Sequence, residues 1–126
     1  MFNKTILVAE DNTDNQELMK AMLELLGYEI DLANDGVEAF EKWKKNRYDL
    51  LILDIQMPNM NGYQVAIEIR KLEAGIRHLP ILALTAGALS GERNKCLEAG
   101  MDDYLTKPMT IDILEKKIAD LLNKEL

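Results

Sequence analysis

Oxygen-bearing and charged side chains stand directly after several short apolar segments of this sequence. They comprise a Glu–Asp pair, a single Asp, a Thr and a Lys: Glu10, Asp11, Asp54, Thr85 and Lys107. Clustered carboxylates repel one another, so a group of this kind either keeps a proton or holds a cation. All the candidate ligands are oxygens, which suits a hard ion such as Mg²⁺ rather than a soft metal.

These residue types suit phosphoryl chemistry. An Asp54 carboxylate can attack phosphorus and become an acyl phosphate, and Mg²⁺ among carboxylates is suited to bridging a phosphoryl group. Lys107 would neutralise the added charge as a point cation, while the Thr85 hydroxyl could donate a hydrogen bond to the phosphoryl oxygens. No Walker-type glycine loop is present, so nucleotide binding is not expected. The plainer alternative for Asp54, that it only begins a turn, loses weight because several strand ends carry complementary groups.

The segment that ends at Asp54 indicates how these side chains are positioned. Residues 50–53 are aliphatic without a break, and a loop rich in Pro, Asn and Gly follows. Such a run is typical of a strand buried on both faces. Segments 5–9 and 80–85 have the same character and predict two more central strands. Segments 28–33 and 103–106 alternate or are short, so they predict edge strands.

Helices are predicted between these strands, at 16–26, 37–46, 62–73, 86–100 and after the capping residue Thr110. The second helix is expected to face the core through Val37, Phe40 and Trp43. The fourth has glycines near its start, which cost about 1 kcal/mol each inside a helix, and should be the most mobile helix.

The first helix carries two adjacent apolar stripes, one of Leu18, Met22 and Leu25 and one of Met19, Leu23 and Leu26. A helix that faces only a sheet usually needs one stripe. The favoured interpretation is a wide core face. The alternative is that the second stripe docks a partner helix.

Five strand–helix repeats predict an α/β fold, with a parallel sheet, right-handed crossovers and helices on both faces. The buried strands must be central, which leads to the strand order 2-1-3-4-5. Ligands bind such sheets beyond the carboxyl ends of the strands, near the point where the order reverses. Here that point lies between the first and third strands. The chemically competent residues should therefore gather at one edge of the sheet.

Bulk properties exclude several classes of function. The 126 residues fit one domain, residues 1–126. A net charge of −7 argues against direct nucleic-acid binding. The single Cys96 and single His78 exclude an internal disulfide and make histidine-based metal or triad chemistry improbable. The apolar run 5–9 is too short for a signal peptide or a spanning helix, so we expect a cytoplasmic protein without membrane insertion.

Four groups of residues together resemble the receiver domain of two-component response regulators, over essentially the whole chain. They are the segments 6–12, Asp54 with Met57, Pro58 and Gly62, the segment 84–86, and the segment 104–108. The five key positions show no departure from the family pattern, and Glu10 in place of Asp is a common variation. Within the family, the sequence looks most like receivers attached to hybrid histidine kinases. The implied fold is the flavodoxin-like (βα)5 receiver fold.

The resemblance implies a role for each site residue. Asp54 would accept a phosphoryl group from a histidine kinase or a histidine phosphotransfer protein. Asp11, Asp54 and the Gln56 backbone carbonyl would bind Mg²⁺ directly, and Glu10 mainly through water. Lys107 would contact the phosphate, and the peptide bond that joins it to the following proline is typically cis in the family.

The resemblance also implies a switch and a set of partners. Thr85 would move inward on phosphorylation and Tyr104 would turn inward with it. This would change a surface formed by the fourth helix, the fifth strand and the last helix, read by an output domain or downstream effector. The protein would not be an enzyme beyond Mg²⁺-dependent self-phosphorylation from a donor and self-dephosphorylation.

Two rival functions follow from the same residues. One is a phosphate-independent interaction module, which would be marked by loss of the acceptor or the lysine, and neither is lost. The other is an aspartyl-phosphate phosphatase. Such enzymes usually carry a second acid two residues after the nucleophile, whereas this chain has Gln56 there.

Overall fold

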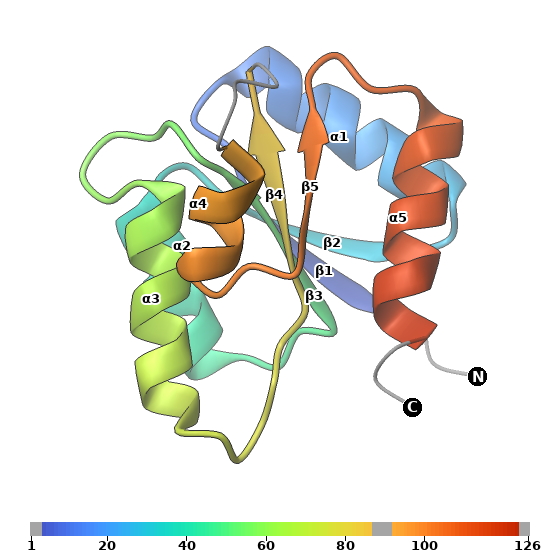
Figure 1. The fold of residues 1–126 in the computed structure, drawn as a ribbon. Coiled ribbons are helices and arrows are strands. Elements are labelled where there is room, and N and C mark those ends of the chain that lie inside the picture. Colours follow the sequence, from blue (N-terminus) through green and yellow to red (C-terminus); the bar gives the residue numbers. More distant parts are fainter. Residues whose placement is uncertain (1–3, 87–91, 124–126) are drawn as a thin grey trace.

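Strands and helices alternate strictly along the chain in the computed structural model, which describes residues 4–86 and 92–123 (Figure 1). The elements are β1 (Thr5–Ala9), α1 (Thr13–Leu25), β2 (Glu29–Ala33), α2 (Gly36–Lys45), β3 (Leu50–Asp54), α3 (Gly62–Glu73), β4 (Ile81–Thr85), α4 (Glu92–Glu98), β5 (Asp103–Thr106) and α5 (Ile111–Asn123).

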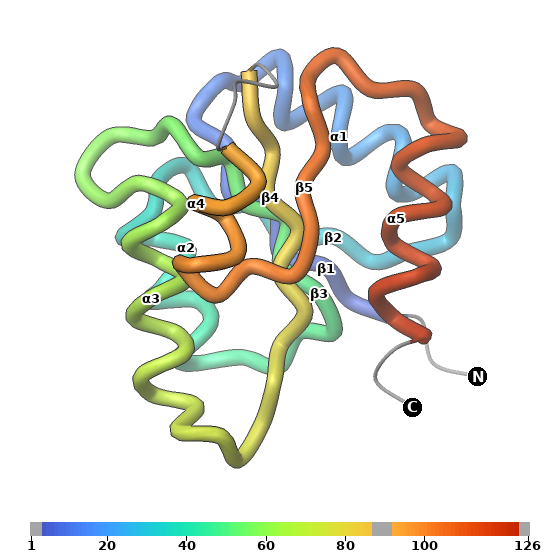
Figure 2. Tube along the Cα trace, in the orientation of Figure 1, coloured from blue at the N-terminus to red at the C-terminus, as the bar shows by residue number. Residues whose placement is uncertain are grey.

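The strands form one parallel sheet in the order β2-β1-β3-β4-β5, which confirms the predicted topology. In Figures 1 and 2, α1 and α5 cover one face of the sheet, and α2, α3 and α4 cover the other. Because successive strand residues point to opposite faces, the central strands supply two separate cores. Leu51 and Leu53 pack under α2, α3 and α4, whereas Leu50 and Ile52 pack under α1 and α5.

Local capping residues set where the helices begin. The Asn12 side chain accepts a hydrogen bond from the Asn15 amide at 2.9 Å, so α1 begins at Thr13 rather than at residue 16 as predicted. Asp35 caps α2 in the same way, with the Glu38 amide as donor. Because β1 and β2 are parallel, the loops that these caps end lie at the same edge of the sheet.

The predicted core face of α2 was wrong at its first position. Val37 is 45% exposed, and Gly36 and Ala39 face the core in its place. Phe40 and Trp43 are partly buried against the core, as predicted, and their rings stack at 6.0 Å. Gly36, the first residue of α2, lies so close to the backbone of Met60 in the loop after β3 that a side chain would not fit there.

The two-stripe pattern of α1 also divides differently from the favoured interpretation. Met19 and Leu23 are buried, whereas Leu18 is 58% and Leu25 is 80% exposed. The prediction of a single wide core face is therefore wrong: the second stripe faces the core through Met19 and Leu23, and the first stripe faces outward at Leu18 and Leu25.

The fourth helix, predicted over residues 86–100, extends over Glu92–Glu98 among the described residues. The glycine-containing start of the prediction, residues 87–91, lies outside the described part of the chain. The expectation that this is the most mobile helix stays a prediction. No helix in the described ranges is long and apolar enough to cross a bilayer.

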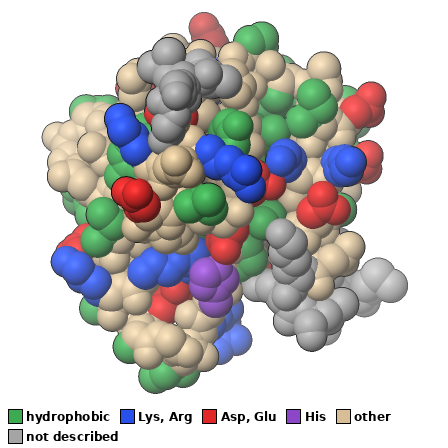
Figure 3. All heavy atoms as spheres, in the orientation of Figure 1, with side chains coloured by type: hydrophobic (Ala, Val, Ile, Leu, Met, Phe, Trp, Pro, Cys, Tyr) green, Lys and Arg blue, Asp and Glu red, His purple; other side chains and the backbone are tan. Residues whose placement is uncertain are grey.

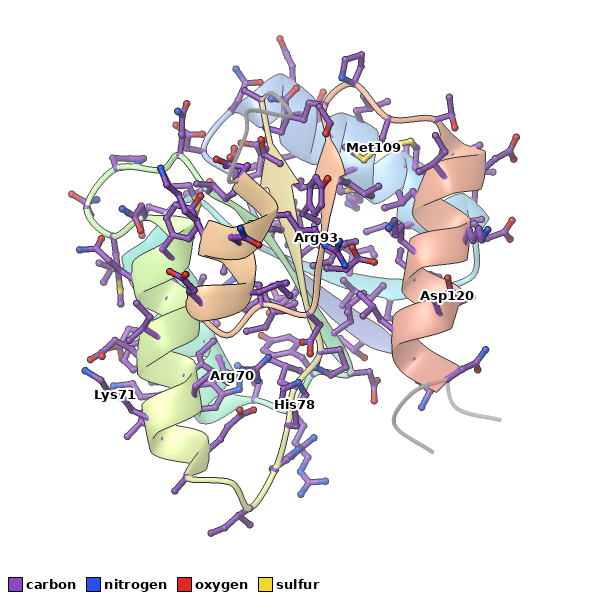
Figure 4. All side chains as sticks on the ribbon, in the orientation of Figure 1. Arg70, Lys71, His78, Arg93, Met109 and Asp120 are labelled. Carbon is purple, nitrogen blue, oxygen red and sulfur yellow. The ribbon has the colours of Figure 1, made fainter. Side chains whose placement is uncertain are left out.

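An ionic network closes the amino-terminal edge of the sheet, away from the predicted site. The Arg70 guanidinium of α3 donates to the Gly100 carbonyl at 2.8 Å and pairs with Glu73 and Asp102. His78 lies 2.6 Å from the same Asp102 carboxylate, and Figure 4 shows Arg70 and His78 in this region. Both carboxylates also accept backbone amides of the loop before β4 or of β4 itself. This cluster therefore joins α3, the start of β4 and the loop between α4 and β5.

Candidate functional site

Three carboxylates meet at the carboxyl ends of β1 and β3, as the strand order requires. One ligand oxygen each from Glu10, Asp11 and Asp54 lies within 4.8 Å of the others. Glu10 and Asp54 are only 2% and 6% exposed, whereas Asp11 faces solvent. The adjacency follows from the pairing of β1 with β3, which puts the two strand ends side by side. Their mutual repulsion is the main electrostatic feature of this edge.

Lys107 reaches the carboxylates from the loop after β5. Its Nζ lies 2.9 Å from Glu10 Oε1 and 3.0 Å from Asp54 Oδ2. Burial by itself would lower the pKa of Lys107, but the hydrogen bonds and charges of the two acids outweigh it and the pKa is raised. The lysine therefore stays protonated at neutral pH and offsets part of the negative charge.

Thr85 ends β4, next to β3, and is 3% exposed. Its carbonyl accepts the backbone N–H of Lys107 at 2.8 Å, which ties the end of β4 to the lysine loop. Tyr104 lies further back along β5, opposite Ala83, and is partly buried against the core. It thus lies on the same edge strand as predicted, set back from the carboxylates.

Gln56 is the remaining predicted ligand residue. Its backbone N–H donates to Asp54 Oδ1 at 3.1 Å, and its side chain is exposed. This contact fixes one oxygen of Asp54 and leaves the loop after β3 folded over the strand end. The donor set at this edge is made of oxygens, which fits a hard divalent cation. Within residues 4–86 and 92–123, no other group of three acidic, His or Cys side chains meets this spacing.

Comparison with known proteins identifies the fold's family. The family model described as the response regulator receiver domain matches residues 6–119. The chain belongs to the response regulator receiver domain family. Receiver domains are signalling switches of two-component systems, and the sequence-based identification is confirmed.

Two sensor kinases contain segments similar to this receiver domain. The sensor protein EvgS of Escherichia coli is 45% identical over 117 residues, which cover 93% of this chain and 10% of EvgS. Hybrid signal transduction histidine kinase I of Dictyostelium discoideum is 41% identical over 124 residues, which cover 94% of this chain and 7% of that protein. The chain thus spans about a tenth or less of these relatives. The predicted similarity to receivers of hybrid histidine kinases is confirmed.

A solved structure is similar to nearly the whole chain. The receiver domain of the sensor histidine kinase PA1611 from Pseudomonas aeruginosa has a TM-score of 0.88 and 42% identity, over 97% of this chain and 99% of that one. That structure is described as having a magnesium ion coordinated in its active site cleft. In our receiver domain the peptide bond between Lys107 and Pro108 is cis, as the resemblance implied.

A pocket of about 350 Å³, not predicted from the sequence, adjoins the carboxylates of this receiver domain. Its walls are mainly apolar and come from β1, α1, β4 and the loop before α5, with Leu18, Met19, Met22, Pro108 and Met109 among them. Figure 4 shows Met109 between α1 and α5. Lys107 and Glu10 also line the pocket, so it opens beside the site. The first apolar stripe on α1, which contains Leu18 and Met22, was the sequence signal for it.

Proposed function

We propose that residues 1–126 form one receiver domain that acts as a phosphoacceptor switch, with Asp54 as the acceptor. One observation carries this proposal: the buried Asp54 carboxylate shares Lys107 with Glu10 and lies beside Asp11 at the strand ends. An oxygen of Asp54 attacks the phosphorus of a phosphohistidine, the P–N bond breaks, and the imidazole nitrogen leaves with a proton from solvent. The product is an acyl phosphate on Asp54.

The residues at this edge fit Mg²⁺ as the bound cation. Asp11, Asp54 and the Gln56 carbonyl would hold it directly, and Glu10 mainly through water. When bound, Mg²⁺ supplies charge neutralisation for the phosphoryl oxygens. Lys107 offsets the remaining negative charge, and the hydroxyl of Thr85 donates to the new phosphoryl group. The domain itself needs no further catalytic group, so self-phosphorylation from a donor and self-dephosphorylation are its only reactions.

The phosphoryl group would be read on the surface of α4, β5 and α5. Thr85 and Lys107 are joined through the backbone at the ends of β4 and β5, so a shift of Thr85 is transmitted to the strand that carries Tyr104. Figure 3 shows acidic, basic and hydrophobic side chains intermingled on this side of the molecule. Leu97 and Ile113 are 46% and 48% exposed on α4 and α5. An output domain or downstream effector would bind here.

The phosphoryl donor would dock on α1. The partner is a histidine kinase or a histidine phosphotransfer protein, acting in the cytoplasm. The pocket between α1 and the Met109 loop is apolar and lies beside Lys107, and Leu18 projects at its margin with 58% exposure. A donor helix that fills it would bring its phosphohistidine close to Asp54. No membrane insertion and no direct contact with nucleic acid form part of this proposal.

Intact-mass measurement after incubation with acetyl phosphate tests the acceptor. We expect one Mg²⁺-dependent phosphoryl adduct on the wild type, none on Asp54→Asn, and the normal adduct on the control Asp14→Asn, which changes an exposed acid of α1. An adduct that persists in Asp54→Asn would assign another acceptor. Absence of any adduct on the wild type would favour the phosphate-independent module.

A further inference from the structure

Two adjacent residues of the loop after β2 contact α1 and the loop after β3, the two segments that flank the site. Asn34 accepts a hydrogen bond from Gln16, and Asp35 accepts one from Asn59, both at 2.9 Å. Gln16 belongs to α1, next to the loop with Glu10 and Asp11, and Asn59 belongs to the loop that follows Asp54. Residues 34 and 35 themselves supply no predicted ligand. Their side chains nonetheless connect the two loops that do.

Gln16 makes the first half of this connection from a buried position. It is 8% exposed, and its Nε2 donates both to the Glu10 carbonyl at 2.5 Å and to Asn34 Oδ1. The Glu10 carbonyl is part of the peptide group that joins Glu10 to Asp11. Holding this oxygen fixes the orientation of that peptide, and with it the starting direction of the Asp11 side chain.

Asn59 makes the second half from the loop after β3. Its backbone is in the left-handed region, with φ of 69°, and its Nδ2 donates to Asp35 Oδ2. The other oxygen of Asp35 accepts the Glu38 amide at 2.8 Å, so the carboxylate is held on both sides. The hydrogen bond from the Glu38 amide, and to a smaller extent that from Asn59, lowers the pKa of Asp35. The carboxylate therefore stays charged.

Close packing strengthens this second contact. A Cβ added to Gly36 would lie 1.9 Å from the Met60 carbonyl oxygen, so the start of α2 rests directly on the loop after β3. The same loop carries Gln56, whose backbone N–H contacts Asp54. The loop after β3 is therefore held in place by its contacts with Asp35 and Gly36, as well as by its connection to β3.

We propose that Asn34 and Asp35 act as a bridge that holds the two ligand loops in register, with Gln16 and Asn59 as positioning residues for Mg²⁺ binding. The proposal rests on the proposed function, because it takes the cation to lie between Asp11, Asp54 and Gln56. Groups that orient metal ligands commonly change metal affinity when they are removed. The bridge extends the site to a strand, β2, that contributes no ligand.

The test compares Mg²⁺ affinity with stability in matched variants. Gln16→Met removes both donated bonds while keeping the side-chain length, and Asn59→Gly removes the second contact while tolerating the positive φ. Gln64→Met is the control, because Gln64 is exposed and its side chain accepts only the Asn61 amide in the cap of α3. The dissociation constant is measured by Mg²⁺ titration of backbone amide NMR signals, and Tm by circular dichroism.

We expect the Kd for Mg²⁺ to rise roughly tenfold in Gln16→Met and in Asn59→Gly, in the range typical of groups that orient ligands, and to stay unchanged in Gln64→Met. A lower Tm with an unchanged Kd in Gln16→Met and Asn59→Gly would overturn the bridge and leave these residues a purely structural role. If Gln16→Met does not fold, the exposed Asn59→Gly decides alone. A wild type without Mg²⁺ binding would instead overturn the proposed function, together with the bridge that rests on it.

Discussion

At the scale of single residues, charge imbalance dominates the site. The carboxylates of Glu10, Asp11 and Asp54 converge on one another, and Lys107 is the cation that contacts two of them. A folded state without a bound cation retains repulsion between these groups, because the fold and not mutual attraction brings them together. Stability and binding are therefore opposed at this edge of the sheet.

Replacing the acceptor should stabilise the metal-free domain. In Asp54→Asn one negative charge is removed while Glu10 keeps its bond to Lys107. The free energy of unfolding should rise by about 1–2 kcal/mol, part of the roughly 4 kcal/mol with which two like unit charges about 4 Å apart repel at an effective dielectric constant of about 20. Urea denaturation in EDTA measures it, with Asp14→Asn as a control for net charge. A less stable Asp54→Asn would show that the bond to Lys107 outweighs the repulsion.

Stability should fall at alkaline pH partly through Tyr63. Burial, followed by the hydrogen bond to Glu92, raises the pKa of Tyr63 to about 12, from an ordinary value of 10.0. The unfolded phenol loses its proton first, so this contribution is complete below pH 10 and is lost as pH rises toward about 12. Tyr48 and Lys107 also have raised pKa values. Urea midpoints measured across this range should fall less steeply in Tyr63→Phe, and an equal slope would contradict the assignment.

At the scale of elements, α1 offers two exposed leucines in different surroundings. Leu18 lines the pocket beside Lys107, whereas Leu25, which is more exposed, does not. Both belong to the first stripe, which the favoured interpretation assigned to a wide core face, whereas the alternative of docking a partner was attached to the second stripe. Their surroundings separate the two explanations, because a side chain at the pocket margin can contact a partner that also reaches Asp54.

Truncation of these leucines should therefore affect phosphotransfer unequally. Leu18→Ala should slow phosphorylation by a phosphohistidine donor protein about tenfold, the effect of losing roughly 1.4 kcal/mol of contact free energy. Phosphorylation by acetyl phosphate should be unchanged, since a small donor needs no docking. Leu25→Ala is the matched control and should behave as wild type with both donors. Equal effects of the two substitutions would argue against docking at the pocket.

The β5 strand connects the site to the proposed readout surface. Tyr104→Ala should accept the phosphoryl group to the wild-type extent, because Tyr104 is set back from the carboxylates. It should also reduce the NMR chemical-shift changes that phosphorylation causes in α4 and α5. Tyr104→Phe, which keeps the ring, should retain them. Normal changes in Tyr104→Ala would count against the Thr85–Tyr104 route.

At the scale of the whole molecule, an acidic chain is organised around one oxygen-rich edge. The formal net charge is −7, and the Arg70 network at the opposite edge is already internally paired. Cation binding at the carboxylates should therefore be linked to global stability, since the ligand loops form only in the folded state.

Added Mg²⁺ should raise Tm. At a concentration ten times Kd, the linkage relation gives about 1.4 kcal/mol of stabilisation. Thermal unfolding with Mg²⁺, with NaCl at equal ionic strength, and with EDTA measures it, and Asp11→Asn should lose most of the gain. A similar gain from NaCl would assign the effect to general screening of the −7 charge.

The sequence alone determined the strand order and the residues at the sheet edge. Unbroken apolar runs distinguish central from edge strands, and the residue that ends each run is local information. The approach of Glu10 to Asp54 follows from that order, because β1 and β3 are neighbours and parallel strands place their carboxyl ends at one edge. Lys107 follows β5, two strands away from β3, so its contacts with both acids also depend on the length of its side chain. Both predictions depended on the apolar runs and on the residues that end them, which can be read directly from the sequence.

Only the tertiary structure decided which side chains of α1 and α2 are buried and how the loops meet. Val37 and Leu18 occupy helical positions compatible with a core face, but the crossing of each helix over the sheet leaves them exposed. The contact of Gln16 with Asn34 joins segments that share no periodicity. Burial of a helix position and loop–loop hydrogen bonds depend on the separation of elements in space, which no local pattern encodes.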